Sequence, residues 1–153
     1  MNPQFDILLT DEIASFLKKQ KLGFVATVSA DNTPNLSPKG TIIVWDNEHL
    51  AFADIRSPDT IKNLKTNPNL EINVIDPIVR KGYLFKGKAK ILHEGQLYEK
   101  ILNQYRNNGV QSPIGDIVLV NITHIENVTS PLYDMGVSED EIKSKWKKHF
   151  LEY

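Results

Sequence analysis

The sequence of 153 residues contains no cysteine. Disulfide bonds, thiolate-ligated metal centres and thiol catalysis are therefore excluded, and the composition is typical of a reducing compartment. No stretch approaches the roughly 20 apolar residues of a membrane span. Met1 to Leu9 lack a basic segment followed by an apolar run of signal length. We therefore expect a soluble cytoplasmic protein.

The sequence also lacks an excess of either charge, with 18 Lys plus Arg against 19 Asp plus Glu. No overall positive field would attract nucleic acid or an anionic membrane. Gly-x-Ser-x-Gly, Walker and Gly-x-Gly-x-x-Gly motifs are absent. The histidines show no metal-ligand spacing; they are His49, His93, His124 and His149. We therefore expect no catalytic side chain and no metal site.

Hydrophobic periodicity and turn residues predict six strands, at residues 24–28, 34–45, 50–55, 70–74, 83–91 and 116–125. Helices are predicted to begin at Thr10, Ser57, Glu94 and Ser138, the first ending at Gly23. Hairpin-type connections with helices at the margins predict a mainly β, α+β fold, an antiparallel barrel with peripheral helices. No linker divides residues 1–153, so we expect a single domain.

The segment from Tyr83 to Ile91 alternates cleanly, with aromatic and small residues on one side and lysines on the other. Gly87 within it predicts a β-bulge or a close approach of another backbone. Lysines beside aromatic residues are also typical of single-strand nucleic-acid binders, which is one alternative function. The alternation argues against it, because Lys86, Lys88 and Lys90 lie opposite Tyr83 and Phe85.

The turn between the third strand and the second helix is suited to an anion. Ser57 fits the N-cap and Pro58 the first helical position, while Thr60 lies in the first turn. Free amides at a helix start attract phosphate, and Arg56 and Lys62 add positive charge. The same pattern also begins helices that bind nothing.

A polar strand face lies before this turn. Ser37, Lys39 and Thr41 recur at period two, so their side chains share one side of the second extended segment. A flavin edge or a phosphate arm needs such a row of polar groups. A solvated outer face would have the same pattern.

The order of these segments, with Asn67-Pro68 and the closing 130–136 segment before Trp146, resembles the flavin-binding split barrels of the pyridoxamine 5'-phosphate oxidase family. The resemblance implies a six-stranded split β-barrel that binds FMN, and a homodimer with FMN at the subunit interface. Matched residue by residue, it implies these cofactor-binding residues: Ser37, Pro38, Lys39, Gly40, Thr41, Asp54, Arg56, Ser57, Thr60, Lys62 and Asn63. Asp59 departs from the family pattern, which often has lysine there.

The function implied by the resemblance is an FMN-dependent oxidoreductase acting on an unidentified small molecule. The alternative within the same class is a flavin carrier or electron-transfer module without a specific substrate. Trp45 and Tyr83 are candidates to line the cofactor groove, although each also fits ordinary barrel packing. A counterpart of the substrate-binding carboxyl segment of full pyridoxamine phosphate oxidases is not evident.

Overall fold

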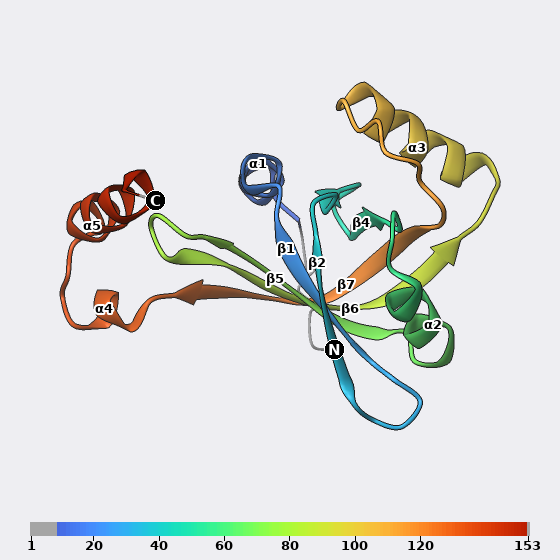
Figure 1. Cartoon of the computed structure of the whole chain (residues 1–153), viewed down its shortest axis with the longest axis horizontal. Coiled ribbons are helices and arrows are strands. Elements are labelled where there is room, and N and C mark those ends of the chain that lie inside the picture. The colour runs from blue at the N-terminus through green and yellow to red at the C-terminus, as the bar shows by residue number, and fades with distance from the viewer. Residues whose placement is uncertain (1–8, 153) are drawn as a thin grey trace, which may run out of the picture.

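The computed structural model describes residues 9–152, which form seven strands and five helices (Figure 1). The strands are β1 (Gly23–Val28), β2 (Pro34–Lys39), β3 (Ile43–Val44), β4 (His49–Ala53), β5 (Asn69–Asp76), β6 (Lys81–Leu92) and β7 (Ile117–Thr129). The helices are α1 (Asp11–Gln20), α2 (Pro58–Thr66), α3 (Gln96–Asn107), α4 (Pro131–Asp134) and α5 (Glu139–Leu151). The expected absence of a signal sequence concerns Met1 to Leu9, of which only Leu9 lies within the described residues.

The strands form one antiparallel sheet in the order β2-β1-β5-β6-β7-β4-β3, curled into a half-barrel with helices around it. The predicted fold class is confirmed, but the sheet has seven strands rather than six. The second extended segment is broken between Lys39 and Ile43, because Thr41 bonds to groups outside the strand ladder. The chain resumes as β3, which pairs with β4.

The main core is a cluster of buried apolar side chains from the sheet together with α1 and α2. Val25, Phe52, Ile72 and Phe85 are each 0% exposed there. A second cluster forms where α3 packs against β4 and β7, around Ile101 and other buried residues. Burial of these apolar surfaces is the dominant favourable term in folding.

The alternation predicted in β6 is confirmed. Phe85 and Gly87 are buried, whereas Lys86, Lys88 and Lys90 are exposed. The register shifts between Lys86 and Gly87, as expected of a bulge. A Cβ on Gly87 would lie 2.5 Å from the Asn121 carbonyl oxygen, so the close backbone approach is also present.

Several predicted boundaries are wrong. The first helix ends at Gln20, before Gly23 is reached, because its C-cap Lys21 adopts a left-handed conformation with φ 55°. The strand predicted at residues 50–55 is β4, and it stops at Ala53 rather than Ile55. Asp54 already belongs to the turn into α2. The short helix α4 was not predicted.

The carboxyl-terminal helices lie at one end of the sheet, beside the β5–β6 turn (Figure 1). The Arg80 guanidinium lies 3.4 Å from the centroid of the Trp146 ring, and Lys81 pairs with Glu139 at 3.2 Å. The predicted cap of α5 is present, since the Glu141 amide donates to Ser138 Oγ. These contacts anchor the segment through side chains rather than through the sheet.

None of the helices within residues 9–152 combines the length and the apolar run that crossing a bilayer would require.

Candidate functional site

A pocket of about 380 Å³ lies where the end of β2, the β4–α2 turn and the loop after α3 meet. We call it the Lys39 pocket. It is lined by Pro38, Lys39, Gly40, Thr41, Ala53, Ile55, Arg56, Ser57, Val110 and Ser112. The pocket thus brings together two predicted segments that are separate in the sequence, residues 38–41 and residues 56–57.

Lys39 is the most unusual group of this pocket. Its side chain is only 5% exposed, and its ammonium donates to Ser37 Oγ at 2.9 Å and to Ser57 Oγ. No ion pair joins it to a carboxylate of residues 9–152. Burial lowers the pKa of Lys39, and the charge of Asp54 opposes this shift only in part. The pocket therefore contains a buried cation whose hydrogen-bond partners are neutral hydroxyls.

The β4–α2 turn presents Ser57 to that cation. The Ser57 amide donates to Asp54 Oδ1 at 2.8 Å, so the Asp54 carboxylate satisfies the start of α2. Ser57 is the N-cap residue and Pro58 the first helical residue, as predicted, but the Ser57 side chain makes no capping bond. It contacts Lys39 instead. Arg56, on the same turn, is exposed.

Thr41 connects the pocket to the second core cluster. Its Oγ1 accepts a hydrogen bond from the Ala53 amide at 2.9 Å, and its carbonyl accepts one from Tyr105 Oη at 2.9 Å. Tyr105 is 1% exposed, and this burial raises the pKa of its phenol. Sequence reasoning missed Tyr105, although its spacing from Ile101 on one face of the helix identifies it as buried.

The remaining predicted residues of α2 lie elsewhere. Thr60 is 1% exposed and does not line the Lys39 pocket. Lys62 and Asn63 line a separate pocket of about 390 Å³ beside the β1–β2 hairpin. Asn63 Nδ2 donates to Thr27 Oγ1 at 3.0 Å within the core. Asp59 also lines the pocket beside the hairpin, so its carboxylate is not among the groups that line the Lys39 pocket.

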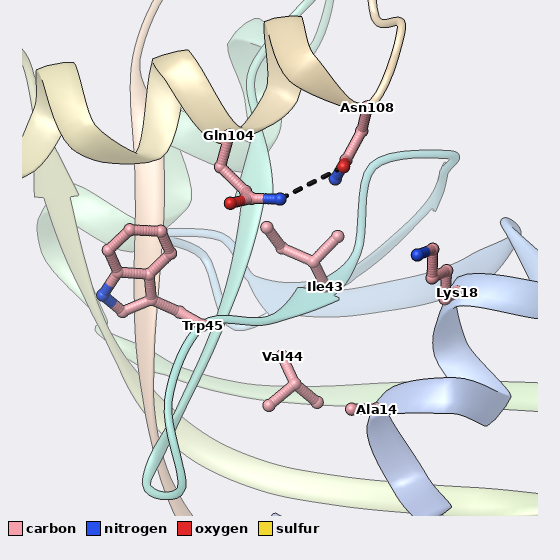
Figure 2. A pocket seen from close by; sticks show the side chains of 7 residues that line it. All are labelled: Ala14, Lys18, Ile43, Val44, Trp45, Gln104 and Asn108. Atoms are coloured by element: carbon pink, nitrogen blue, oxygen red, sulfur yellow. Dashed lines mark hydrogen bonds between the residues drawn. The ribbon is translucent and has the colours of Figure 1, made fainter. Parts of the chain in front are cut away.

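The two aromatic candidates differ. Tyr83 packs against the main core and meets Phe16 edge-to-face, with ring centroids 5.1 Å apart. Trp45 is half-buried and lines a pocket of about 260 Å³, in which Gln104 donates to Asn108 (Figure 2). Of the two, Trp45 lines one of the pockets described here.

Three of the histidines pair with carboxylates, the shortest contact being His93 Nδ1 to Asp116 Oδ1 at 2.6 Å. Within residues 9–152, no three His, Asp or Glu side chains are grouped closely enough to hold a metal ion.

Comparison with known proteins identifies the family. The sequence profile described as pyridoxamine 5'-phosphate oxidase matches residues 9–128. The chain belongs to the pyridoxamine 5'-phosphate oxidase family. The match includes every residue of the Lys39 pocket and ends before α4 and α5.

This chain is similar to several known proteins over most of their length. It is 30% identical over 128 residues to the uncharacterised protein MJ0282 of Methanocaldococcus jannaschii, covering 81% of this chain and 83% of the relative. It resembles HupZ of Group A Streptococcus with a TM-score of 0.72 and 27% identity, over 80% and 96% of the two chains. An FMN-binding protein from Syntrophomonas wolfei shares the fold, with a TM-score of 0.65, 16% identity and coverage of 76% and 84%.

Proposed function

We propose that this protein is an FMN-binding flavoprotein, acting as one domain over residues 1–153, and that the Lys39 pocket binds the phosphate of the cofactor. The observation that carries the proposal is the buried Lys39 ammonium, which has two hydroxyl partners and no carboxylate partner within residues 9–152. A phosphomonoester with nearly two negative charges would restore the electrostatic balance lost on burial.

The chemistry of the donors fits this group. Lys39 supplies a charge-assisted hydrogen bond, Ser37 and Ser57 supply hydroxyls, and Arg56 adds a second positive charge at the mouth. No Asp or Glu lines the pocket. Asp54 holds the turn through the Ser57 amide and does not itself bind the anion.

We further propose that the protein is a cytoplasmic oxidoreductase. FMN, when bound, supplies hydride or electron transfer, and the chain positions it and excludes water. A flavin carrier without a specific substrate is the second candidate. It is favoured by the pocket lining, in which the only ionisable side chains are the two cations Lys39 and Arg56. Turnover with a reduced nicotinamide donor separates the two functions.

The first test is selectivity for the phosphate. FMN is expected to bind at least about tenfold more tightly than riboflavin, because riboflavin lacks the partner of Lys39. Titration of the purified protein by flavin fluorescence measures both affinities. Equal affinities, or no binding of either flavin, would refute the phosphate assignment.

The lowered pKa of Lys39 predicts a pH dependence. The phosphate stabilises the charged ammonium, so FMN binding raises the pKa of Lys39 back toward its ordinary value of 10.5. As pH rises through the lowered pKa of the free protein, binding must take up a proton and the affinity falls. FMN titrations across alkaline pH should show this fall in the wild type. Lys39→Arg, which stays charged, should show a smaller fall, and identical profiles would contradict the assignment.

We also propose that the protein is a homodimer that uses the outer face of β1 and β2. Phe24 and Leu36 are 42% and 67% exposed on this face, and Leu36 lies opposite Ala26 in the strand pairing. An exposed apolar strip on a regular sheet edge is suited to a two-fold contact with the same strip of a second copy.

Leu36→Glu is therefore expected to weaken the dimer by more than about 100-fold, because a buried unpaired charge costs about 3–5 kcal/mol. Leu151→Glu is the matched control, since Leu151 is 85% exposed on α5, away from the strip. Analytical ultracentrifugation over a dilution series, with and without FMN, measures the change. A wild-type monomer that binds FMN with undiminished affinity would exclude a site shared between subunits.

A further inference from the structure

A second pocket adjoins the Lys39 pocket across Gly40 and Thr41. It has a volume of about 470 Å³ and lies between α1, β3 and the end of α3. We call it the α1–α3 pocket. Its lining residues are Leu17, Lys18, Lys21, Gly40, Thr41, Ile42, Ile43, Tyr105, Asn107, Asn108, Gly109 and Val110. This volume is within the range typical of small-molecule sites.

The α1–α3 pocket adjoins a pocket on each side. It shares Gly40, Thr41 and Val110 with the Lys39 pocket. It shares Lys18, Ile43 and Asn108 with the pocket that Trp45 lines, and all three are labelled in Figure 2. A ligand in the α1–α3 pocket would therefore lie next to a cofactor whose phosphate is held by Lys39.

The charged side chains that line this pocket are all positive. Lys18 and Lys21 line the α1–α3 pocket, both are exposed, and neither forms an ion pair within residues 9–152. No Asp or Glu lines this pocket or the Trp45 pocket. The amides of Asn107 and Asn108 add hydrogen-bonding groups.

The rest of the lining is apolar. Leu17 and Ile42 are buried at 2% and 6% exposure, and Ile43 and Val110 are half-buried. A pocket with an apolar floor and two cations at its edge selects a ligand with an apolar body and an anionic group.

Lysines at the end of α1 also compensate the helix dipole, which requires no ligand. Lys19 lies in the same last turn of α1 but does not line either pocket. Dipole compensation treats Lys18 and Lys19 alike, whereas ligand binding needs only the lysines of the pocket. Lys19 is therefore a matched control.

We propose that the α1–α3 pocket binds the substrate, and that the substrate is a small organic anion with an apolar or aromatic body. Its anionic group contacts Lys18 and Lys21, and its body lies on Ile43 and Val110, from which it reaches the cofactor across Gly40 and Thr41. This assignment rests on the proposed FMN function for its redox role, but the pocket itself can be tested without FMN.

The test uses phenyl phosphate as the anionic probe and benzyl alcohol as the neutral one. The chain has two tryptophans, so Trp146→Phe leaves Trp45 as the single reporter, and Lys39→Met removes the buried cation of the neighbouring pocket. In this background, phenyl phosphate should change Trp45 fluorescence saturably and bind about tenfold more tightly than benzyl alcohol. Adding Lys18→Gln with Lys21→Gln should weaken it about tenfold or more, whereas Lys19→Gln should not.

Equal binding of the two probes, no saturable change, or an equal loss in Lys19→Gln would overturn the proposal. A second measurement determines the FMN affinity of the Lys18→Gln/Lys21→Gln variant with Lys39 intact. Unchanged FMN affinity is expected, and a loss as large as that for phenyl phosphate would assign the pocket to the cofactor instead. If the wild type binds no FMN, the proposed function fails, while the Trp45 titration still decides whether this pocket binds anions.

Discussion

Replacing Lys39 with methionine is expected to weaken FMN binding by about 1.5–3 kcal/mol, or about 10- to 150-fold. Methionine keeps much of the buried aliphatic volume but removes the cation. The free protein should unfold with an unchanged or higher free energy, since a buried ammonium with a lowered pKa is a cost to the folded state at neutral pH. Flavin titration and urea denaturation of the same sample measure the two effects.

Arg56→Met is the comparison for Lys39→Met. Arg56 is exposed at the mouth of the Lys39 pocket, so water screens its charge and the loss of affinity should stay below about 1 kcal/mol. If Arg56→Met loses FMN while Lys39→Met keeps it, the phosphate lies at the mouth of the pocket and the buried lysine has only a structural role.

Phe85→Ala is expected to lower the free energy of unfolding by about 3–5 kcal/mol. Phe85 is 0% exposed at the centre of the main core, and removal of its ring leaves a cavity that the surrounding strands cannot fill. The expected loss is a large part of the total stability of a typical domain. Urea denaturation followed by circular dichroism measures it.

Lys86→Ala tests the opposite, exposed face of β6, one position along the strand from Phe85. Lys86 is exposed and pairs with Glu71 at 3.4 Å, so its loss should cost less than about 1 kcal/mol. Where Phe85→Ala does not fold, Phe85→Leu should still fold, with a loss clearly larger than that of Lys86→Ala, because the smaller side chain leaves part of the cavity unfilled. Similar losses in Phe85→Leu and Lys86→Ala would contradict the assignment of the two faces.

Features set by neighbours in sequence were predictable. The alternation of β6, the bulge at Gly87 and the Ser138 cap of α5 all depend on residues a few positions apart. The local pattern therefore contains their cause. The family resemblance, carried by the order of such local segments, was confirmed by the profile match.

Features set by distant partners were not predictable. The break after Lys39 arises because Thr41 bonds to Ala53 and to Tyr105, which is 64 positions away. Spacing alone placed Arg56 and Lys62 together around the helix start. The structure separates them into different pockets, because α2 turns Lys62 toward the β1–β2 hairpin. Burial of Lys39 likewise depends on the β4–α2 turn, which closes over it through Ser57.

The position of β4 at the far side of β7 has a consequence for biosynthesis. Strands β1, β2, β5 and β6 can pair as soon as residue 92 has left the ribosome, but β4 joins the sheet only through β7, and β3 only through β4. The wall formed by Thr41 and Ala53 therefore waits for Tyr105 and for residues 117–121 to be synthesised. A ribosome-bound chain completes the Lys39 pocket late, only after residue 121 of 153 has been translated, although most of the residues that line the pocket lie in the first half of the sequence.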